Sequence, residues 1–196
     1  MLRSAYRLAR GTGIALLLAA APISSAYAMD SAGIEQRSTS LDPGEYVWNP
    51  AGAPEGPIEI VVSIPMQLAY VYRGGQLIGA STVSTGMPGH DTPTGTFTIL
   101  QKRRTHFSNL YDNAPMPFMQ RLTWDGIALH AGQIPGTPAS HGCVRLPMAF
   151  ARTLFGATGL GTRVHIVDAS FASAEQALAI GRTMAPDEHA ELASNG

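Results

Sequence analysis

The sequence predicts a mainly β protein, built as a small sandwich or barrel-like sheet with one short helix. Residues 58–64 are dense in β-branched side chains, which is typical of a buried strand. Residues 68–73 and 76–85 are strand candidates on either side of Gly74-Gly75, a dipeptide that favours a two-residue hairpin turn. Many short strands separated by turn signals favour this architecture over alternating strands and helices.

The later part of the chain supplies the remaining strands and the helix. Strand character recurs over residues 96–100, 116–122, 127–129 and 163–167. Residues 86–93 are a loop by composition. The helix is predicted to begin at Pro147, a residue that suits a first helical turn, and to run to about Phe155. Gly156 and Gly159 are its stop signals.

Residues 1–28 have the order of a secretory signal peptide. Three arginines and no acidic residue come first, an unbroken apolar run follows over residues 14–21, and Ala26-Tyr27-Ala28 ends the segment. The apolar run is too short to span a bilayer, which needs roughly 20 residues. We therefore expect an exported protein of the periplasm or cell envelope, with no integral membrane segment after cleavage.

The composition also divides the rest of the chain. Residues 29–57 are rich in Ser, Pro, Gly and Ala and are predicted to be a flexible N-terminal segment, either a tether or a loosely attached strand. Residues 58–168 form the expected ordered domain. Residues 169–196 are expected to hold a short helix over 174–183 and then a frayed tail.

The charge balance restricts the possible binding partners. The chain has 13 basic and 14 acidic residues, and loss of Arg3, Arg7 and Arg10 with the signal leaves 10 and 14, a net charge of about −4. This mildly acidic balance argues against nucleic acid as a partner. We expect a monomer without a cofactor or a metal site.

The most informative residue is Cys143, the one cysteine in the chain. It lies in Ser140-His141-Gly142-Cys143, and His130 precedes it by thirteen residues. A thiol is a strong nucleophile as thiolate, and a nearby histidine is the usual means of removing its proton. An unpaired cysteine with histidines elsewhere in the sequence is the pattern of a catalytic nucleophile. The chain is therefore predicted to be an enzyme.

The predicted elements bring these residues together. His130 ends a strand and Cys143 lies just before the helix, so the loop between them must fold back to one end of the sheet. Gly142 allows a sharp turn, and the amides of residues 141–143, just ahead of the helix, are expected to donate to a developing oxyanion.

The segment Ser140-His141-Gly142-Cys143-Val144-Arg145, with His130 upstream and Thr92-Pro93-Thr94-Gly95-Thr96-Phe97 before it, resembles the L,D-transpeptidase (YkuD-like) family. The resemblance covers about residues 58–168. It implies a β-sandwich catalytic domain of exported bacterial proteins that remodel peptidoglycan, acting on its stem peptides. It also implies that Cys143 is the nucleophile and that His130 is the general base, oriented by a nearby backbone carbonyl such as that of Ala131. His141, Gly142 and Ser140 would shape the turn and oxyanion site.

Two departures from the family pattern border the expected substrate groove. Arg145 stands where many members have asparagine, although arginine is a familiar variant there, and the loop between His130 and Cys143 is short. Arg145 is either an ordinary surface charge or a residue that binds a stem-peptide carboxylate through two parallel hydrogen bonds. His141 has either a direct chemical role or a structural one. No separate peptidoglycan-binding module is evident.

Three function classes stay open at this point. The first is a cysteine acyltransferase that forms a thioester with a stem tetrapeptide and passes it to an amine, giving a 3→3 cross-link or a similar product. The second is a hydrolytic L,D-carboxypeptidase or endopeptidase of the same fold. The third is a non-enzymatic wall- or metal-binding protein that uses His130, His141 and Cys143 as ligands.

Overall fold

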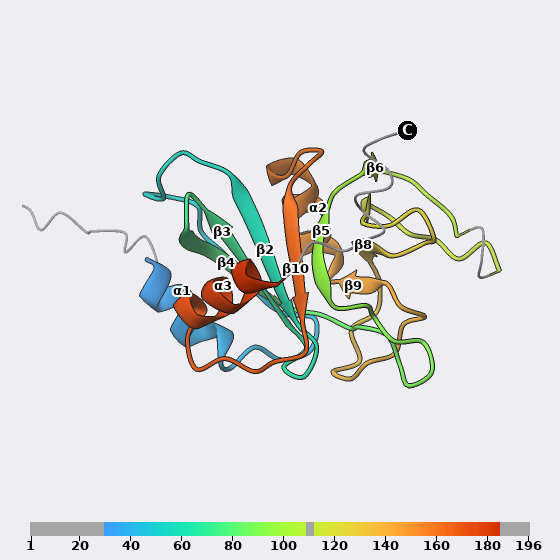
Figure 1. Ribbon diagram of the computed structural model, residues 1–196, viewed down its shortest axis with the longest axis horizontal. Coiled ribbons are helices and arrows are strands. Elements are labelled where there is room, and N and C mark those ends of the chain that lie inside the picture. Colours follow the sequence, from blue (N-terminus) through green and yellow to red (C-terminus); the bar gives the residue numbers. More distant parts are fainter. Residues whose placement is uncertain (1–29, 109–111, 185–196) are drawn as a thin grey trace, which may run out of the picture.

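The protein consists of two β-sheets and three helices, as seen in a computed structural model that describes residues 30–108 and 112–184 (Figure 1). The larger sheet has the strand order β1-β4-β3-β2-β10-β5, and the smaller sheet has the order β6-β7-β8-β9. The strands of the larger sheet are β1 (Tyr46–Trp48), β2 (Ile58–Ser63), β3 (Leu68–Arg73), β4 (Gln76–Thr82), β5 (Gly95–Thr98) and β10 (Arg163–Val167). Those of the smaller sheet are β6 (Gln101–Arg103), β7 (Met119–Arg121), β8 (Ala128–Ala131) and β9 (Val144–Leu146).

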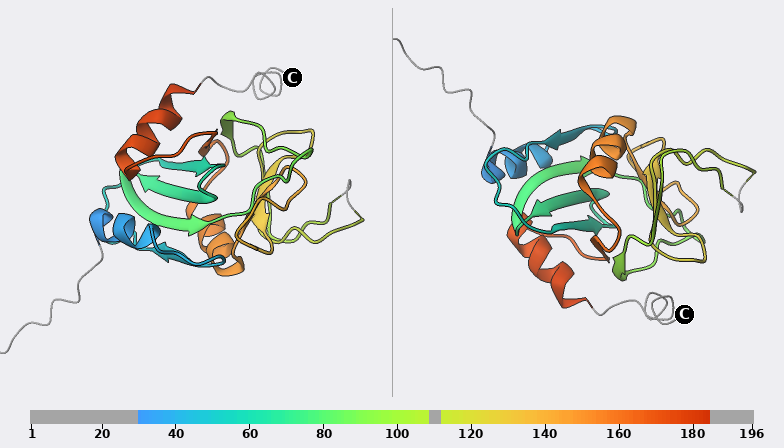
Figure 2. Two further views of the ribbon diagram at one scale, coloured as in Figure 1. Left: turned by 90° about the horizontal axis from the view of Figure 1, so that it is seen from below. Right: turned by 90° about the horizontal axis from the view of Figure 1, so that it is seen from above.

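The larger sheet is covered on both faces, which explains the uninterrupted apolar character of its central strands. Side chains alternate along β2, so that Ile60 and Val62 face the core shared with the smaller sheet, whereas Val61 faces the other way. On that second face lie α1 (Ser31–Ser38) and α3 (Ala174–Thr183) (Figure 2). The predicted mainly β, two-sheet fold is confirmed.

The core between the sheets also includes the helix that follows Cys143. This helix, α2 (Met148–Ala157), buries Phe150, Ala151 and Leu154. Its neighbours in the core come from both sheets, among them Leu129 of β8. Because α2 packs against the core face of the smaller sheet, it supports β8 and β9 from that side.

Several predicted elements differ from the observed ones at their ends. The hairpin turn lies at Gly74 and Gly75, which have φ of +56° and +83°, but β4 ends at Thr82 rather than at residue 85. The strand predicted over 116–122 is reduced to β7, and β6 and β9 were not predicted. Both are three residues long, so they are too short to carry a periodic pattern.

The segment over residues 29–57 is more ordered than its composition predicted. Asp30 caps α1 by accepting from the Gly33 amide at 2.9 Å, Ile34 is fully buried, and β1 pairs with β4 in antiparallel fashion. This segment therefore contains a capped helix and an edge strand. The predicted helix over 174–183 is present as α3.

Some predictions lie outside the described residues. These are the signal peptide over residues 1–28 and the tail that follows Met184. Within the described ranges, no helix has the length and apolar character needed to cross a membrane.

Candidate active site

The candidate base lies on β8 of the smaller sheet, and the candidate nucleophile immediately precedes β9, the parallel neighbour of β8. β8 and β9 pair with Leu129 opposite Val144 and with His130 opposite Arg145. Leu129 and Val144 point into the core, so alternation places His130 and Arg145 on the opposite face. Cys143 comes two residues before Arg145 and therefore faces the same side.

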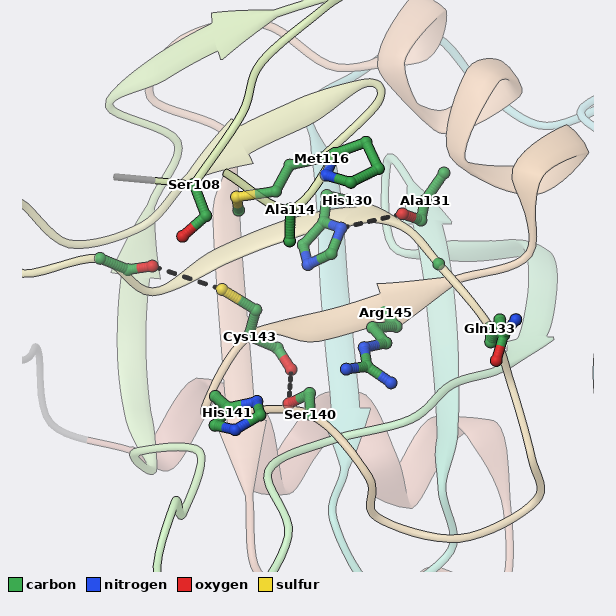
Figure 3. Close-up of a pocket in the computed structure, with 13 residues that line it drawn as sticks. Ser108, Ala114, Met116, His130, Ala131, Gln133, Ser140, His141, Cys143 and Arg145 are labelled. Atoms are coloured by element: carbon green, nitrogen blue, oxygen red, sulfur yellow. Dashed lines mark hydrogen bonds between the residues drawn. The ribbon is translucent and has the colours of Figure 1, made fainter. Parts of the chain in front are cut away.

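A cavity of about 330 Å³ opens on this face of the smaller sheet (Figure 3). The side chains of His130, Cys143 and Arg145 point into it, and Ser140 and His141 form part of its wall. The structure thus brings together in one cavity all of the predicted site residues except Gly142, which is buried beneath the turn.

The imidazole of His130 has a defined tautomer. Its Nδ1 atom lies 2.9 Å from the carbonyl oxygen of Ala131, and because a carbonyl can only accept, Nδ1 carries the proton. Burial lowers the pKa of His130 to about 4, against the effect of this hydrogen bond and assisted by the positive charge of Arg145. Near neutral pH the ring is therefore neutral, with the lone pair on Nε2.

The Cys143 thiol makes a different contact. It donates to the carbonyl oxygen of Gly126 at 3.3 Å (Figure 3). Burial raises the pKa of the thiol, and a hydrogen bond from the backbone of Ala128 and the positive charges of Arg121 and Arg145 oppose that effect. Cys143 and His130 are both described, and no hydrogen bond joins them. The resting site therefore holds a neutral thiol beside a neutral imidazole, not a preformed thiolate–imidazolium pair.

The turn before Cys143 is held by Ser140 and Gly142. The Ser140 hydroxyl accepts from the Gly142 amide at 3.2 Å and donates to the Cys143 carbonyl at 2.5 Å. Gly142 has a φ of +105°, and a Cβ at this position would lie 3.0 Å from Cδ1 of Ile127. Both the backbone conformation and the space require glycine here.

The environment of the three amides of residues 141–143 differs from the expectation. The helix α2 begins at Met148, and β9 separates it from Cys143. The N-terminus of a helix therefore does not flank the nucleophile. The Gly142 amide already donates to Ser140, so it is less available to an oxyanion than the sequence suggested.

The loop over residues 86–92, which leads into β5 of the larger sheet, is hydrogen-bonded to this turn. The buried hydroxyl of Thr92 donates to the Gly142 carbonyl at 2.8 Å and accepts from the Gly86 amide at 2.8 Å. The Met87 amide donates to the Ser140 carbonyl at 2.9 Å. These bonds fasten the turn to residues 86–92, so Thr92 positions the motif without touching the cavity.

The guanidinium of Arg145 lies in the cavity without an acidic partner among the described residues. Its aliphatic stem crosses Gly132, where a Cβ would lie 2.9 Å from its Cγ and Cδ atoms. Glycine at position 132 thus makes room for this side chain. The arrangement leaves the charge of Arg145 facing the cavity, as a carboxylate-binding role requires.

His141 is exposed at the cavity wall, and its ring packs edge-on against His90, with the ring centroids 4.5 Å apart. No cluster of three or more His, Cys, Asp or Glu side chains that could hold a metal ion occurs in residues 30–108 and 112–184. The metal-binding alternative with His130, His141 and Cys143 as ligands therefore has no cluster to support it.

Sequence reasoning missed three residues of this site. Thr92 appeared only as part of a family motif, and neither Gly126 nor Arg121 was singled out. No local signal marks these residues, because each reaches Cys143 or the turn before it through strand pairing or loop packing.

Fold and site together define a class of protein: a two-sheet domain with a histidine on one strand and a cysteine just before the adjacent parallel strand. The L,D-transpeptidase catalytic domain (YkuD) family model matches residues 57–166, and this chain belongs to that family. No curated protein matches the chain in a sequence comparison.

Solved structures give the same result. The chain is similar to an L,D-transpeptidase from Stackebrandtia nassauensis, with 28% identity and a TM-score of 0.53 over 59% of this chain and 57% of that one. A second similar structure is the L,D-transpeptidase from Xylanimonas cellulosilytica, with 25% identity and a TM-score of 0.53 over 58% of this chain and 62% of that one. A third similar structure is the L,D-transpeptidase LdtMt1 in complex with imipenem, with 26% identity and a TM-score of 0.52 over 56% of this chain and 58% of that one. The chain spans less than two thirds of each.

Proposed function

We propose that this protein is an exported cysteine acyltransferase that remodels peptidoglycan. The observation that supports the proposal is the cavity that Cys143, His130 and Arg145 share. It brings together a thiol, a neutral imidazole and a guanidinium that has no acidic partner in residues 30–108 and 112–184. Membership of the L,D-transpeptidase family supports the reaction class. The substrate is a stem tetrapeptide.

In the first half-reaction the thiol turns from Gly126 toward the imidazole, and Nε2 of His130 takes its proton. The sulfur attacks the carbonyl carbon of the third stem residue, and a tetrahedral oxyanion forms. The C–N bond to the terminal D-amino acid then breaks, and the leaving amine takes the proton from Nε2. A thioester remains on Cys143.

In the second half-reaction an amine attacks the thioester carbonyl and passes a proton to Nε2 of His130. The C–S bond breaks, and the proton returns to the sulfur of Cys143. The product is a new amide, such as a 3→3 cross-link. Water in place of the amine would give the hydrolytic alternative, which shares the first half-reaction.

The remaining residues have supporting roles in this proposal. Ser140 and Gly142 hold the turn that places the Cys143 amide toward the oxyanion, and His141 completes the wall. The guanidinium of Arg145 binds a carboxylate of the donor peptide. The signal-like residues 1–28 support export to the periplasm or cell envelope, and we propose that the mature chain acts as a monomer.

Intact-mass analysis with a tetrapeptide donor tests the proposal. We expect the mature protein to gain the mass of the donor minus its terminal amino acid, and we expect an added amine to discharge this adduct as an amide. Cys143→Ala should gain nothing. If folded wild-type protein forms no thioester, the enzyme proposal fails. Because one L,D-transpeptidase neighbour was solved with imipenem, a carbapenem is a second acyl donor for Cys143.

A further inference from the structure

The basic and acidic residues of this chain are unevenly distributed along the sequence. Residues 92–167, which include the smaller sheet and α2, hold seven basic residues and two acidic ones, Asp112 and Asp125. The other residues of 29–196 hold three basic and twelve acidic residues. The net charge of about −4 is therefore the sum of a cationic segment and a more strongly anionic remainder. Such a separation of charge orients a protein toward a partner of one charge sign.

Two of these basic residues meet at the surface beside α2. The guanidinium carbon of Arg104, just after β6, lies 5.8 Å from the ring centroid of Phe118, and that of Arg152 on α2 lies 5.6 Å from the same centroid. Arg104 also lies 5.9 Å from the ring of Phe155, which packs edge-on against Phe118 with the centroids 5.8 Å apart. We call Arg104, Arg152 and these two rings the α2 patch.

The two guanidiniums of the α2 patch are held in place but not neutralised. Both arginines are exposed, and neither forms an ion pair with an acidic residue of the described ranges 30–108 and 112–184. Contact with an aromatic ring restricts each long side chain through cation–π attraction. Two like charges near one ring repel each other. An anion that reaches both would relieve this repulsion and would meet side chains that are already positioned.

Lys102 fixes the two halves of the α2 patch to each other. Its ammonium group donates to the carbonyl oxygens of Phe155 and Thr158 at 2.7 and 2.6 Å, and it lies 4.4 Å from the ring centroid of Phe155. These bonds join β6, which leads to Arg104, to the end of the helix that carries Arg152. The patch is therefore a surface of two elements that a third cation holds together.

The α2 patch is separate from the catalytic cavity. Lys102 of β6 pairs with Gln120 of β7, which pairs in turn with Leu129 of β8, so all three lie on the core face of the smaller sheet, where α2 packs. The cavity opens on the opposite face, and no residue of the patch lines it. A ligand at the patch therefore leaves the cavity free for the donor peptide.

We propose that the α2 patch binds carboxylates of the peptidoglycan polymer, at a point away from the stem peptide that enters the cavity. This inference rests on the proposed function, because that function supplies the polymer. A guanidinium matches a carboxylate in two parallel hydrogen bonds, and a polymer of stem peptides presents many carboxylates. Weak attachment at a second point raises the effective concentration of the donor at the cavity.

The overall negative charge of the chain does not prevent this attachment. Salt screens exposed charges beyond about 8 Å at physiological ionic strength, so acidic residues at greater distances oppose it only weakly. The rings of the patch also distinguish between anionic partners. Phe118 is buried and Phe155 half-buried, so the patch presents charge rather than an aromatic surface that could enter a bilayer. This favours a hydrated anionic polymer over a lipid membrane.

Co-sedimentation with insoluble peptidoglycan sacculi tests the inference. Every binding sample uses the mature chain with Cys143→Ala, so that no thioester attaches it covalently to the polymer. We expect binding that weakens as the salt concentration rises. We also expect several-fold weaker binding to sacculi whose carboxylates have been converted to amides, because the guanidiniums then lose their anionic partners.

Arg104→Gln and Arg152→Gln should each weaken sacculus binding by about threefold or more, because a charged hydrogen-bond donor is lost. Arg37→Gln is the matched control, since it changes the net charge equally at an exposed position of α1, on the other face of the larger sheet. With Cys143 restored, all three variants should form the thioester with a soluble tetrapeptide at the same rate.

Several results would overturn the inference. These are equal loss of binding in all three variants, unchanged binding in both patch variants, and equal binding to native and amidated sacculi. Binding to phosphatidylglycerol vesicles but not to sacculi would assign the patch to a membrane and would also overturn it. In each case thioester formation by the wild-type chain would leave the proposed function standing. Patch-dependent binding to sacculi without any thioester would instead refute the enzyme proposal and leave a wall-binding site.

Discussion

The Nδ1–H of His130 donates to the carbonyl oxygen of Ala131, its neighbour in β8, across 2.9 Å. A backbone carbonyl is neutral, so it fixes the ring without adding the negative charge that a carboxylate would bring. Burial can then lower the pKa of the imidazole to about 4. The hydrogen bond to the carbonyl raises the pKa of the ring, but burial outweighs it, so the oriented base is neutral near neutral pH.

This relationship predicts the pH dependence of thioester formation. His130 accepts a proton only when neutral, so the rate should be lost as pH falls through about 4 rather than through 6.5, the ordinary value for histidine. Initial rates of thioester formation between pH 3.5 and 8, read by intact mass, give the acid limb. His130→Ala should lower the rate at pH 7 by about 10²- to 10⁴-fold. A wild-type limb centred near pH 6.5 would contradict the buried, neutral imidazole.

The alkylation of Cys143 by iodoacetamide should depend steeply on pH. Burial raises the pKa of the thiol above its ordinary value near 9, so the thiolate fraction should increase about tenfold per pH unit through the neutral range. Rates measured from pH 6 to 9.5 on wild-type protein test this. A plateau between pH 6 and 8 would instead indicate a preformed thiolate–imidazolium pair.

A carbapenem should acylate Cys143 and no other residue. The sulfur attacks the strained lactam carbonyl, the ring C–N bond opens and the nitrogen takes a proton, so the whole drug mass stays attached. Mass spectrometry should show one added drug mass on wild-type protein and none on Cys143→Ala. Ser140 is not followed by a lysine three residues later, as a penicillin-binding serine would be. An adduct mapped to a serine would therefore contradict the mechanism.

Gly142→Ala should impair the site more than the fold. A side chain at φ +105° is strained by about 1–3 kcal/mol, and its Cβ would press on Ile127. We expect thioester formation to slow at least tenfold, together with a moderate loss in the free energy of unfolding. Gly159→Ala is the matched control, since no atom lies within 4 Å of its would-be Cβ. Equal activity of the two variants would show that the turn tolerates a side chain.

Glu59 is expected to make the stability of the fold depend on pH. Its side chain is almost fully buried, and Arg182 of α3 and Arg163 of β10 contact it at 2.5 and 3.3 Å. The hydrogen bond from Arg182 lowers the pKa of this carboxyl below its ordinary value near 4.5, although burial acts in the opposite direction. The stabilisation is therefore complete above about pH 4.5 and is lost as pH falls further.

Glu59→Gln should lower the free energy of unfolding by about 1–3 kcal/mol at pH 7, and the lower end is expected because both arginines are half exposed. Near pH 3.5 the difference should shrink, since the wild-type carboxyl begins to be protonated. Urea unfolding at the two pH values measures both quantities. Glu55→Gln, at an exposed position, is the control. A difference that does not change with pH would contradict the charged state of Glu59.

The sequence was sufficient for features that depend on neighbouring residues. The β-branched run over 58–64, the Gly74-Gly75 turn and the helix over 174–183 all have local signals, and the structure places elements there. The chemistry of Cys143 was also visible, because a single cysteine beside glycine and histidine differs from a core thiol.

By itself the sequence determined which residues carry reactive groups and that residues 58–64 form a buried strand, since these follow from side-chain chemistry and from an uninterrupted run of strand-forming residues. Only the tertiary structure decided that β8 and β9 are parallel neighbours, that the Gly126 carbonyl accepts a hydrogen bond from the thiol and that Arg121 shares a face with Cys143. It also decided that residues 30–48 contribute a helix and an edge strand. Pairing between distant strands is selected by the total burial and hydrogen bonding of the whole fold, and three-residue strands have too little pattern of their own to reveal it.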